Sequence, residues 1–302
     1  MTRPDLLRLA TEIRRLAIVA IHAARSGHPG GALSAADILA VLFGGELGLS
    51  LETMALPARN RFVLSKGHAC PALYAAGAGI GLVSREAVYG LRKLGSVMQG
   101  HPDVKLLPWV ETSTGSLGQG MSVACGIALG QRLKGMSARS YVLLGDGELQ
   151  EGEIWEAAMF AAHHRLANLC AIVDYNKMQS DDLNENIMGL APLAEKWRSF
   201  GWRVEEIDGH DQGAIAAAFA GFRAEPGRPS VIIAHTIKGK GVSFMEGVPS
   251  WHGSVTMREA DTVQALADLG VAEQDIPGWI DASIHKKMID ASIHSKTTEA
   301  AR

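Results

Sequence analysis

Cysteine is scarce in this chain, and long apolar runs are missing. The three cysteines, Cys70, Cys125 and Cys170, are far apart and have no metal-ligand spacing. An odd number of scattered cysteines excludes a disulfide framework and indicates reduced, buried thiols of a cytoplasmic protein. The first apolar stretch, residues 16–21, is too short for a secretory signal or a membrane helix, so neither is expected.

An excess of one charge is also missing. The formal net charge is −3 and the isoelectric point is near 6.4, which gives no electrostatic footprint for nucleic acid or an anionic membrane. With 302 residues, 47% hydrophobic and 20% charged, the composition is typical of a soluble globular protein with a large core.

Short apolar runs alternate with segments of helical periodicity along most of the chain. Helices are expected over 5–25, 34–42 (with Ser34 as N-cap), 121–133 and 153–164, and strands at 61–65, near 141 and 169, and at 202–207 and 230–234. This alternation predicts an α/β fold, a mainly parallel sheet with helices on both faces.

The C-terminal end differs from the rest. We expect one domain over residues 1–270 and a tail over 271–302 that is partly helical or frayed. The tail repeats the hexapeptide IDASIH at 280–285 and 289–294, which is too short for a repeat architecture.

Two polar residues end neighbouring apolar runs. Asp146 lies in a Gly-Asp-Gly tripeptide after one run, and Asn176 follows the next run 30 residues later, a separation that suits one strand–helix–strand crossover. Both side chains would then lie at the carboxyl ends of parallel strands, where ligands collect. Their hard oxygens suit a magnesium-like ion and the flanking glycines let a phosphate approach, so a metal–diphosphate site is predicted.

Five histidines lie in loops beside glycine, proline or tryptophan: His28, His68, His101, His210 and His252. Glycine lets the backbone approach a ligand, and imidazole moves protons near neutral pH. No pair has the spacing of a zinc-binding helix, which disfavours a histidine metal site.

Two further features are weak when taken alone. The glycine-rich segment 115–120 opens a helix whose first amides are expected to face an anion, although it could equally be a tight turn. Lys238, in Lys-Gly-Lys-Gly, is either a phosphate counter-charge or a solvated loop lysine.

Together these motifs resemble the N-terminal, diphosphate-binding part of the transketolase family. The similar stretches run in family order from about residue 15 to 255: SGHPGGALSAADILAVLF, RFVLSKGHACPALYA, GHPD, TGSLGQGMSVACGIALG, LLGDGELQEGEIWEA, VDYNKMQSD, HTIKGKG and SWHG. One short motif is weak evidence, whereas eight in order are specific.

The resemblance implies thiamine diphosphate and Mg²⁺ as cofactors, with Ca²⁺ or Mn²⁺ as possible substitutes. It makes Asp146, Asn176 and the backbone carbonyl of Met178 the metal ligands. By the same resemblance, cofactor binding falls to Gly115, Ser116, Leu117, Gly147, His68, Asn176, Lys238 and His252; catalysis falls to His28, His101 and His252; and an interface relay falls to Glu151 and Glu156. Glu148 and Glu153 are expected to be ordinary carboxylates at a helix start.

Two departures from the family stand out. Gly30 and Gly31 occupy positions where the family often has a hydroxyl residue, so one cofactor contact would be lost or made by the backbone. In addition, nothing after residue 255 resembles the domain that binds the cofactor's pyrimidine ring and supplies its activating glutamate.

The resemblance therefore implies the N-terminal subunit of a split transketolase, which would move a two-carbon ketol unit between sugar phosphates such as pentose phosphates. A separate C-terminal subunit would complete an α2β2 assembly. Two alternatives remain open: the α subunit of a 2-oxo acid dehydrogenase-type thiamine enzyme, and a catalytically silent regulatory or binding module of the same fold.

Overall fold

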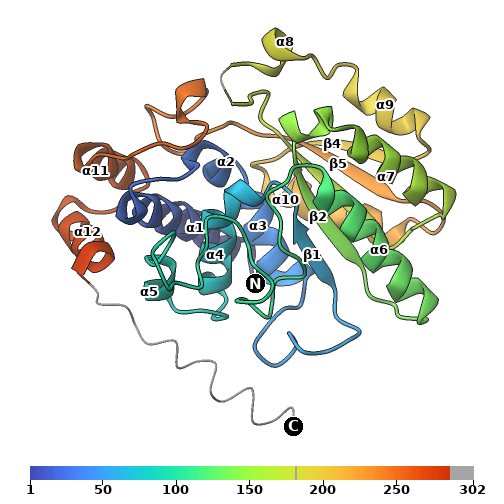
Figure 1. Cartoon of the computed structure of the whole chain (residues 1–302), viewed down its shortest axis with the longest axis horizontal. Coiled ribbons are helices and arrows are strands. Elements are labelled where there is room, and N and C mark those ends of the chain that lie inside the picture. The colour runs from blue at the N-terminus through green and yellow to red at the C-terminus, as the bar shows by residue number, and fades with distance from the viewer. Residues whose placement is uncertain (181, 286–302) are drawn as a thin grey trace.

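The computed structural model describes residues 1–180 and 182–285 (Figure 1). Its centre is a parallel five-stranded sheet with the strand order β1-β2-β3-β5-β4. The strands are β1 (Arg61–Leu64), β2 (Ser140–Gly145), β3 (Leu169–Tyr175), β4 (Arg203–Asp208) and β5 (Ser230–His235). In register, Gly145 of β2 pairs with Asp174 of β3, so these two strands end together.

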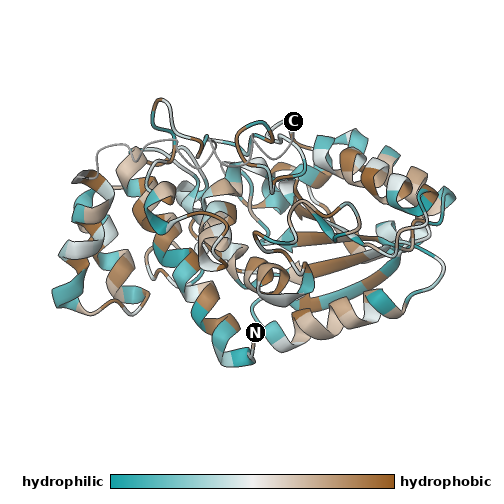
Figure 2. Cartoon of the chain, turned by 90° about the horizontal axis from the view of Figure 1, so that it is seen from below, coloured by the Kyte–Doolittle hydropathy of each residue, from teal (hydrophilic) through white to brown (hydrophobic). Residues whose placement is uncertain are grey.

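The central strands are buried on both faces, as parallel sheets require. All six residues of β2 are buried, and successive residues contribute to different hydrophobic clusters. Tyr141 and Leu143 pack on one face of the sheet, whereas Val142 and Leu144 pack on the other. Figure 2 shows the result, with apolar residues along the strands and a mixture of apolar and hydrophilic residues along the helices.

Helices cover both faces of the sheet (Figure 1). The layer that packs on the Tyr141 and Leu143 face of the sheet consists of α1 (Arg3–Ala24), α2 (Pro29–Ser34), α3 (Ala36–Val41), α4 (Cys70–Gly79) and α10 (Gln212–Ala224). The opposite layer is built from α6 (Gln119–Leu133), α7 (Gly152–His163) and α9 (Leu193–Ser199). The fold class predicted from the sequence is confirmed.

Shorter elements complete the chain. They are α5 (Arg85–Val88), α8 (Asn184–Ile187), α11 (Glu259–Asp268), α12 (Ile276–His285), the π-helical turn η1 (Leu42–Glu46) and the 3-10 turns η2 (Gly67–Ala69), η3 (Gly147–Gln150), η4 (Pro249–Trp251) and η5 (Glu273–Asp275). The helices α11 and α12 pack beside α1. The first copy of the tail hexapeptide lies in α12, and the second copy and the predicted frayed end lie outside the described residues.

One local expectation was wrong. Ser34 is not the N-cap of α3, because Ala35 occupies that position and α2 already ends at Ser34. The Ser34 hydroxyl is buried and donates instead to the carboxylate of Asp174 in β3, at 2.6 Å. The pull of a buried carboxylate from a distant strand outweighs the local preference for capping. Within residues 1–180 and 182–285, no helix combines the length and hydrophobicity needed to cross a bilayer.

Candidate functional site

The carboxyl ends of β2, β3 and β5 bring three predicted site residues to one edge of the sheet. Asp146 follows β2, Asn176 follows β3, and Lys238 comes three residues after β5. The strands pair in parallel in that spatial order, so their ends meet. Open α/β sheets bind ligands outside the carboxyl ends of their strands, which is where these three residues lie.

Asp146 is buried, with 2% of its surface exposed. Its carboxylate accepts from the Gly147 amide at 2.8 Å and from the Lys177 amide. Burial and the nearby charge of Asp174 raise the pKa of Asp146 to about 6, against the opposing effect of Lys238. A cation next to Asp146 would stabilise the charged form of this carboxylate.

The turn after β3 contacts Asp146 through the Lys177 amide and presents the Met178 carbonyl to Lys238. Lys177 adopts a left-handed conformation with φ 66°, which is uncommon for a non-glycine residue. The turn lets the Asn176 side-chain oxygen accept from the Met178 amide at 3.2 Å. The Met178 carbonyl accepts a hydrogen bond from the Lys238 ammonium at 2.8 Å.

Lys238 is not a solvated loop lysine, because only 1% of its surface is exposed. Besides the Met178 carbonyl, its ammonium donates to Nδ1 of His252. Burial lowers the pKa of Lys238 to about 8, although Asp146 nearby opposes the shift. Of the two interpretations of this lysine, the structure favours a buried charge held at the site.

The residues 236–241, here called the Lys238 loop, pack against Gly30. The Gly239 amide donates to the Gly30 carbonyl at 3.1 Å. A Cβ atom on Gly30 would lie 2.7 Å from Cγ of Lys238 and 2.8 Å from the Trp251 carbonyl. The glycine at this position therefore makes room for the lysine side chain.

The oxygen atoms at the edge of the sheet fit a hard divalent cation. Asp146 offers a carboxylate, Asn176 an amide oxygen and Met178 a carbonyl, which are ligand types that Mg²⁺ accepts. The ammonium of Lys238 already binds the Met178 carbonyl and lies close enough to Asp146 to influence its pKa. Among the described residues, no group of three or more His, Cys, Asp or Glu side chains could hold a metal. A site here would therefore combine one carboxylate with neutral oxygens.

Three of the loop histidines form a cluster. The ring centroids of His28, His68 and His252 lie 5.1 Å (His28–His68), 5.6 Å (His68–His252) and 6.0 Å (His28–His252) apart. Burial is the main cause that lowers the pKa of His28 to about 4 and that of His252 to about 3, and it also holds the pKa of His68 well below 6.5. Neighbouring positive charges from Lys238 and Lys66 act in the same direction. The cluster is therefore neutral near pH 7.

Cations fix the tautomers of two of these rings. An ammonium can only donate, so Nδ1 of His252 accepts from Lys238 and the ring proton lies on Nε2. Arg92 lies 3.5 Å from Nδ1 of His28 and acts on it in the same sense. Each ring is left with Nε2–H as its free donor.

His101 lies beside the glycine-rich segment. A Cβ atom on Gly115, whose φ is 143°, would lie 2.9 Å from the His101 ring. Positive charge on His101 lowers the pKa of His28, so the two rings are close enough to interact. In the same segment, Ser116 is exposed and Leu117 is half-buried.

At the N-terminus of α6, the carboxylate of Glu148 takes the place predicted for an anionic ligand. The Gly118 amide donates to the Glu148 carboxylate at 2.9 Å, so this amide is not free for a ligand. Glu148 also accepts from the Gly145 amide at 2.9 Å and from the Ser65 hydroxyl. Its exposed fraction is 2%, and burial raises the pKa of Glu148 against these three hydrogen bonds. The expectation that Glu148 is an ordinary helix-start carboxylate was wrong.

A further buried carboxylate, Asp174, was not singled out from the sequence. It is fully buried and receives hydrogen bonds from Lys66, Ser34 and Thr236. Burial would raise the pKa of Asp174, but the Lys66 charge and the three donors outweigh that effect and lower it. The ion pair ties β3 to the segment that carries His68. The one sequence signal for this ion pair is that Lys66 stands two residues before His68, in Ser-Lys-Gly-His.

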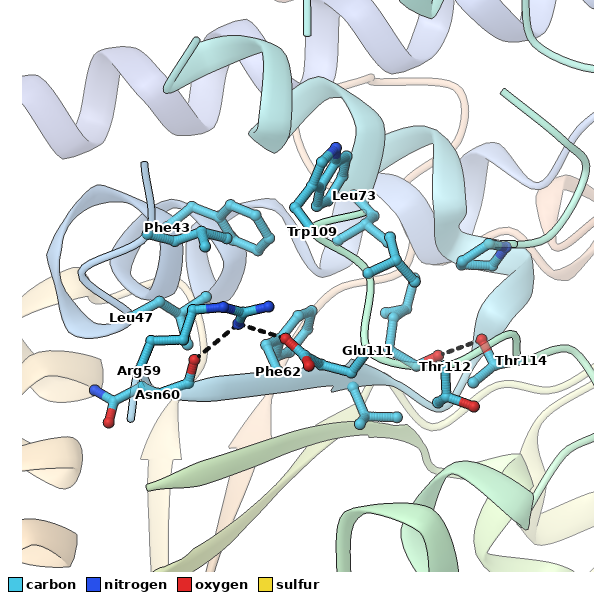
Figure 3. A pocket seen from close by; sticks show the side chains of 15 residues that line it. Phe43, Leu47, Arg59, Asn60, Phe62, Leu73, Trp109, Glu111, Thr112 and Thr114 are labelled. Carbon is cyan, nitrogen blue, oxygen red and sulfur yellow. Dashed lines mark hydrogen bonds and ion pairs between the residues drawn. The ribbon is translucent and has the colours of Figure 1, made fainter. Parts of the chain in front are cut away.

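A small cavity lies beside β1, under the segment that leads into the glycine-rich loop (Figure 3). Its volume is about 10 Å³, room for about one water molecule. The Glu111 side chain, which is 8% exposed, forms ion pairs with Arg61 and with Arg59, the latter drawn in Figure 3, and these pairs fasten this segment to β1. The Thr114 hydroxyl adds a bond to the Leu64 carbonyl at 2.7 Å. The cavity is too small for a substrate, and its contacts hold Gly115 in place.

Glu151 and Glu156 are exposed, Glu151 just before α7 and Glu156 within this helix. Glu151 packs against Gly118, where an added Cβ would approach the Glu151 side chain to 3.1 Å.

Comparison with known proteins agrees with this geometry. The family described as transketolase, thiamine diphosphate binding domain, matches residues 7–300. The 6-deoxy-6-sulfo-D-fructose transketolase subunit SqwG of Clostridium sp. (strain MSTE9) is 42% identical over 88% of this chain and 96% of that protein. One subunit of the apulose-4-phosphate transketolase of Phocaeicola vulgatus is 38% identical over 84% of this chain and 91% of that protein.

Solved transketolases share the fold. The transketolase of Leishmania mexicana superposes with a TM-score of 0.82 at 30% identity, covering 99% of this chain and 46% of that one. The Campylobacter jejuni enzyme gives a TM-score of 0.81 at 30% identity, covering 94% of this chain and 46% of that one. These matches define a thiamine diphosphate-binding α/β domain. The chain belongs to the transketolase family and corresponds to its N-terminal part.

Proposed function

We propose that this chain is the N-terminal subunit of a two-chain transketolase, which transfers a two-carbon ketol unit between sugar phosphates. The observation that carries the proposal is the joint presence of Asp146, Asn176 and Lys238 at one sheet edge with the neutral histidine cluster beside it. Two relatives that match along nearly their whole length are themselves named as transketolase subunits.

The cofactors in this proposal are thiamine diphosphate and Mg²⁺, with Ca²⁺ or Mn²⁺ able to replace Mg²⁺. Asp146, Asn176 and the Met178 carbonyl would hold the metal, while Gly147 and Lys238 would hold the diphosphate. His68 and the segment Gly115, Ser116, Leu117 would complete the cofactor contacts. The buried cation at Lys238 supports this arrangement, since a lysine with 1% exposure needs an anionic partner.

The histidines would handle protons and hold the sugar. Bound thiamine diphosphate supplies the carbon nucleophile that carries the two-carbon unit. His28 and His252 are neutral, with Nε2–H free to donate to hydroxyl and carbonyl oxygens of the sugar. His101, next to Gly115, would be a further donor to the sugar.

A second chain is required by this proposal. The chain spans nearly all of two subunit relatives but under half of the solved transketolases. The partner would bring the pyrimidine-binding and C-terminal domains, and two copies of each would form an α2β2 assembly. Exposed apolar side chains of α6 and α7, namely Val123, Leu133, Met159 and Phe160, support burial of these helices in an assembly. Met159 and Phe160 follow Glu156 by three and four residues, on the same side of α7. The proposed roles of Glu151 and Glu156 as an interface relay belong to the same assembly.

Several finer points belong to the same proposal. Residues 1–270 would form the cofactor-binding domain and 271–302 the tail, and the protein would act in the cytoplasm. The substrate would be a sugar phosphate. The names of the relatives, 6-deoxy-6-sulfo-D-fructose transketolase and apulose-4-phosphate transketolase, make sugars with an anionic end the class to assay first.

The decisive experiment is reconstitution. We expect the chain alone to show no ketol transfer, and the chain with its C-terminal partner to transfer a two-carbon unit between sugar phosphates when thiamine diphosphate and Mg²⁺ are present. Robust transfer by the isolated chain would contradict the split-subunit proposal.

The two alternatives give different outcomes in the same assay. A 2-oxo acid dehydrogenase-type enzyme would decarboxylate 2-oxo acids and leave sugar phosphates unchanged. A silent binding module would show no cofactor binding even with the partner. The transketolase relatives and the histidine cluster favour ketol transfer over both.

A further inference from the structure

One loop histidine, His210, lies outside the cluster of His28, His68 and His252. It follows β4 in the pair Gly209-His210, and its side chain is 13% exposed. Gly209 lets this segment approach β5 closely, since an added Cβ would lie 2.4 Å from Cγ2 of Thr236. The Gly209 amide also donates to the His235 carbonyl at 2.8 Å. His210 is therefore held against the beginning of the Lys238 loop.

Both ring nitrogens of His210 have defined partners. Nδ1 lies 2.9 Å from the Asp37 carboxylate, and Nε2 accepts from the backbone amide of Ile237 at 2.9 Å. A backbone amide can only donate, so Nε2 carries no proton and Nδ1–H donates to Asp37. An imidazolium would set one N–H against another at Ile237. The contacts thus select one neutral tautomer.

Asp37 is itself fixed from several directions. It is 5% exposed, in α3, and it accepts from Arg14 of α1 and from Gln212 of α10 as well as from His210. Burial would raise the pKa of Asp37, but the His210 hydrogen bond and the Arg14 charge outweigh it and keep the pKa low. Contacts among three helices, α1, α3 and α10, thus hold the Asp37 carboxylate in place as an acceptor.

The loop that His210 holds carries the lysine of the site. Ile237 immediately precedes Lys238, and the loop is otherwise anchored by Thr236 to Asp174 and by Gly239 to Gly30. The His210 bond lies between these two anchors. Without it, the Ile237 amide would lose its hydrogen bond, and the backbone just before Lys238 would be held less firmly.

We propose that His210 is a positioning residue that, as a neutral Nδ1–H imidazole bridging Asp37 to the Ile237 amide, orients Lys238 for the diphosphate. It does not touch the cofactor site and acts through the lysine. This inference rests on the proposed cofactor role of Lys238, whereas the tautomer follows from the contacts of the chain alone.

The first test reads the tautomer directly. Long-range ¹H–¹⁵N spectra of the full chain with labelled imidazoles, with His210→Phe used to assign the signal, should show the His210 proton on Nδ1 and a bare Nε2 at pH 7.5. A proton on Nε2, a doubly protonated ring or an averaged signal would overturn the proposal. This result does not depend on any enzymatic activity.

The second test measures thiamine diphosphate binding by calorimetry, using the two-chain complex with Mg²⁺. His210→Phe keeps a ring but loses both hydrogen bonds, so the dissociation constant should rise about fivefold to tenfold. His210→Gln keeps a donor and an acceptor in one side chain and should restore binding to within about twofold of the wild type. The matched control is His235→Phe, since His235 lies two residues from Ile237 and pairs with Glu206 at an exposed position.

A double-mutant cycle separates positioning from mere support of the fold. In a Lys238→Met background, His210→Phe should cause no further loss of cofactor affinity, whereas its cost in thermal stability should persist. Additive losses of affinity would overturn the proposal. If His210→Phe does not fold, His210→Gln serves for the assignment instead, and a loss of cofactor affinity in the His210→Gln complex well beyond twofold would overturn the proposal. If the wild-type complex binds no thiamine diphosphate, the proposed function fails, and the tautomer measurement still stands.

Discussion

The carboxylate of Glu148 and the amide of Gly118 are 2.9 Å apart, a hydrogen bond that joins the turn after β2 to the N-terminus of α6. The same carboxylate also accepts from Gly145 and Ser65. Gly145 directly precedes Asp146, and Ser65 is three residues before His68. One buried side chain thus holds together three segments that carry candidate cofactor residues. The Gly118 amide at the N-terminus of α6 therefore has a partner within the chain and is not available to a ligand.

Replacing Glu148 by glutamine should destabilise the chain while preserving its shape. An amide can accept at its oxygen, but its NH₂ group would face a backbone N–H, leaving a buried donor unsatisfied. We expect a loss of about 1–3 kcal/mol in the free energy of unfolding, measured by denaturant titration. Glu153→Gln, whose partner Gln119 is at an exposed site, is the control and should change little. Equal effects of both variants would contradict the role assigned to Glu148.

Gly30→Ala should disturb Lys238. The added methyl would lie 2.7 Å from Cγ of Lys238, so the side chain has to move and overpacking of about 1–3 kcal/mol is expected. Cofactor affinity should fall together with stability, and both can be measured by calorimetry. Gly278→Ala in α12, where an added Cβ meets nothing within 4 Å, should be neutral or slightly stabilising. A wild-type cofactor affinity in Gly30→Ala would show that the glycine does not serve the lysine.

Asp146→Asn should abolish metal-dependent cofactor binding. The amide keeps the size of the side chain but removes the charge that a divalent cation requires, so thiamine diphosphate affinity in Mg²⁺ should fall by more than about tenfold. Chelation of the metal should weaken the wild type and leave the variant unchanged. Glu195→Gln, an exposed carboxylate of α9, serves as the control for loss of one charge. Unchanged binding by Asp146→Asn would remove Asp146 from the ligand set.

Mild acid should destabilise the histidine cluster. The pKa of His28 is lowered to about 4 and that of His252 to about 3, whereas an unfolded histidine titrates near 6.5. Between these limits the unfolded chain binds protons that the folded chain excludes, so stability falls as the pH drops from about 6.5 towards 4. Thermal unfolding across this range should show a shallower slope when His28 and His252 are both replaced by asparagine. Replacement of the exposed His163 should leave the slope unchanged.

Much of the architecture follows from local patterns in the sequence. The apolar run before Asp146 and the run before Asn176 predict two neighbouring parallel strands, and the structure pairs them as β2 and β3. The positions of Asp146 and Asn176 at the strand ends follow from that pairing alone. Local periodicity and the rules of parallel sheets are sufficient here.

The contacts between distant segments could not be predicted in this way. Glu148 has the position of a helix-start residue, and its role depends on Ser65 and Gly118 arriving beside it. Ser34 has the position of an N-cap, but Asp174 lies 140 residues away in sequence and captures its hydroxyl. Each of these roles is decided by packing between layers, for which sequence periodicity contains no information.

The hydrogen bond from Lys238 to the Met178 carbonyl has a thermodynamic consequence. Under the proposed ligand set, an ammonium occupies a carbonyl that the metal ion would use, so the ion alone must displace a buried positive charge that then has no anion. A diphosphate arriving with the metal gives that charge a new partner. We therefore expect metal and diphosphate to bind cooperatively, each tightening the site for the other, with the lysine acting as an internal competitor that discourages loading of either one alone.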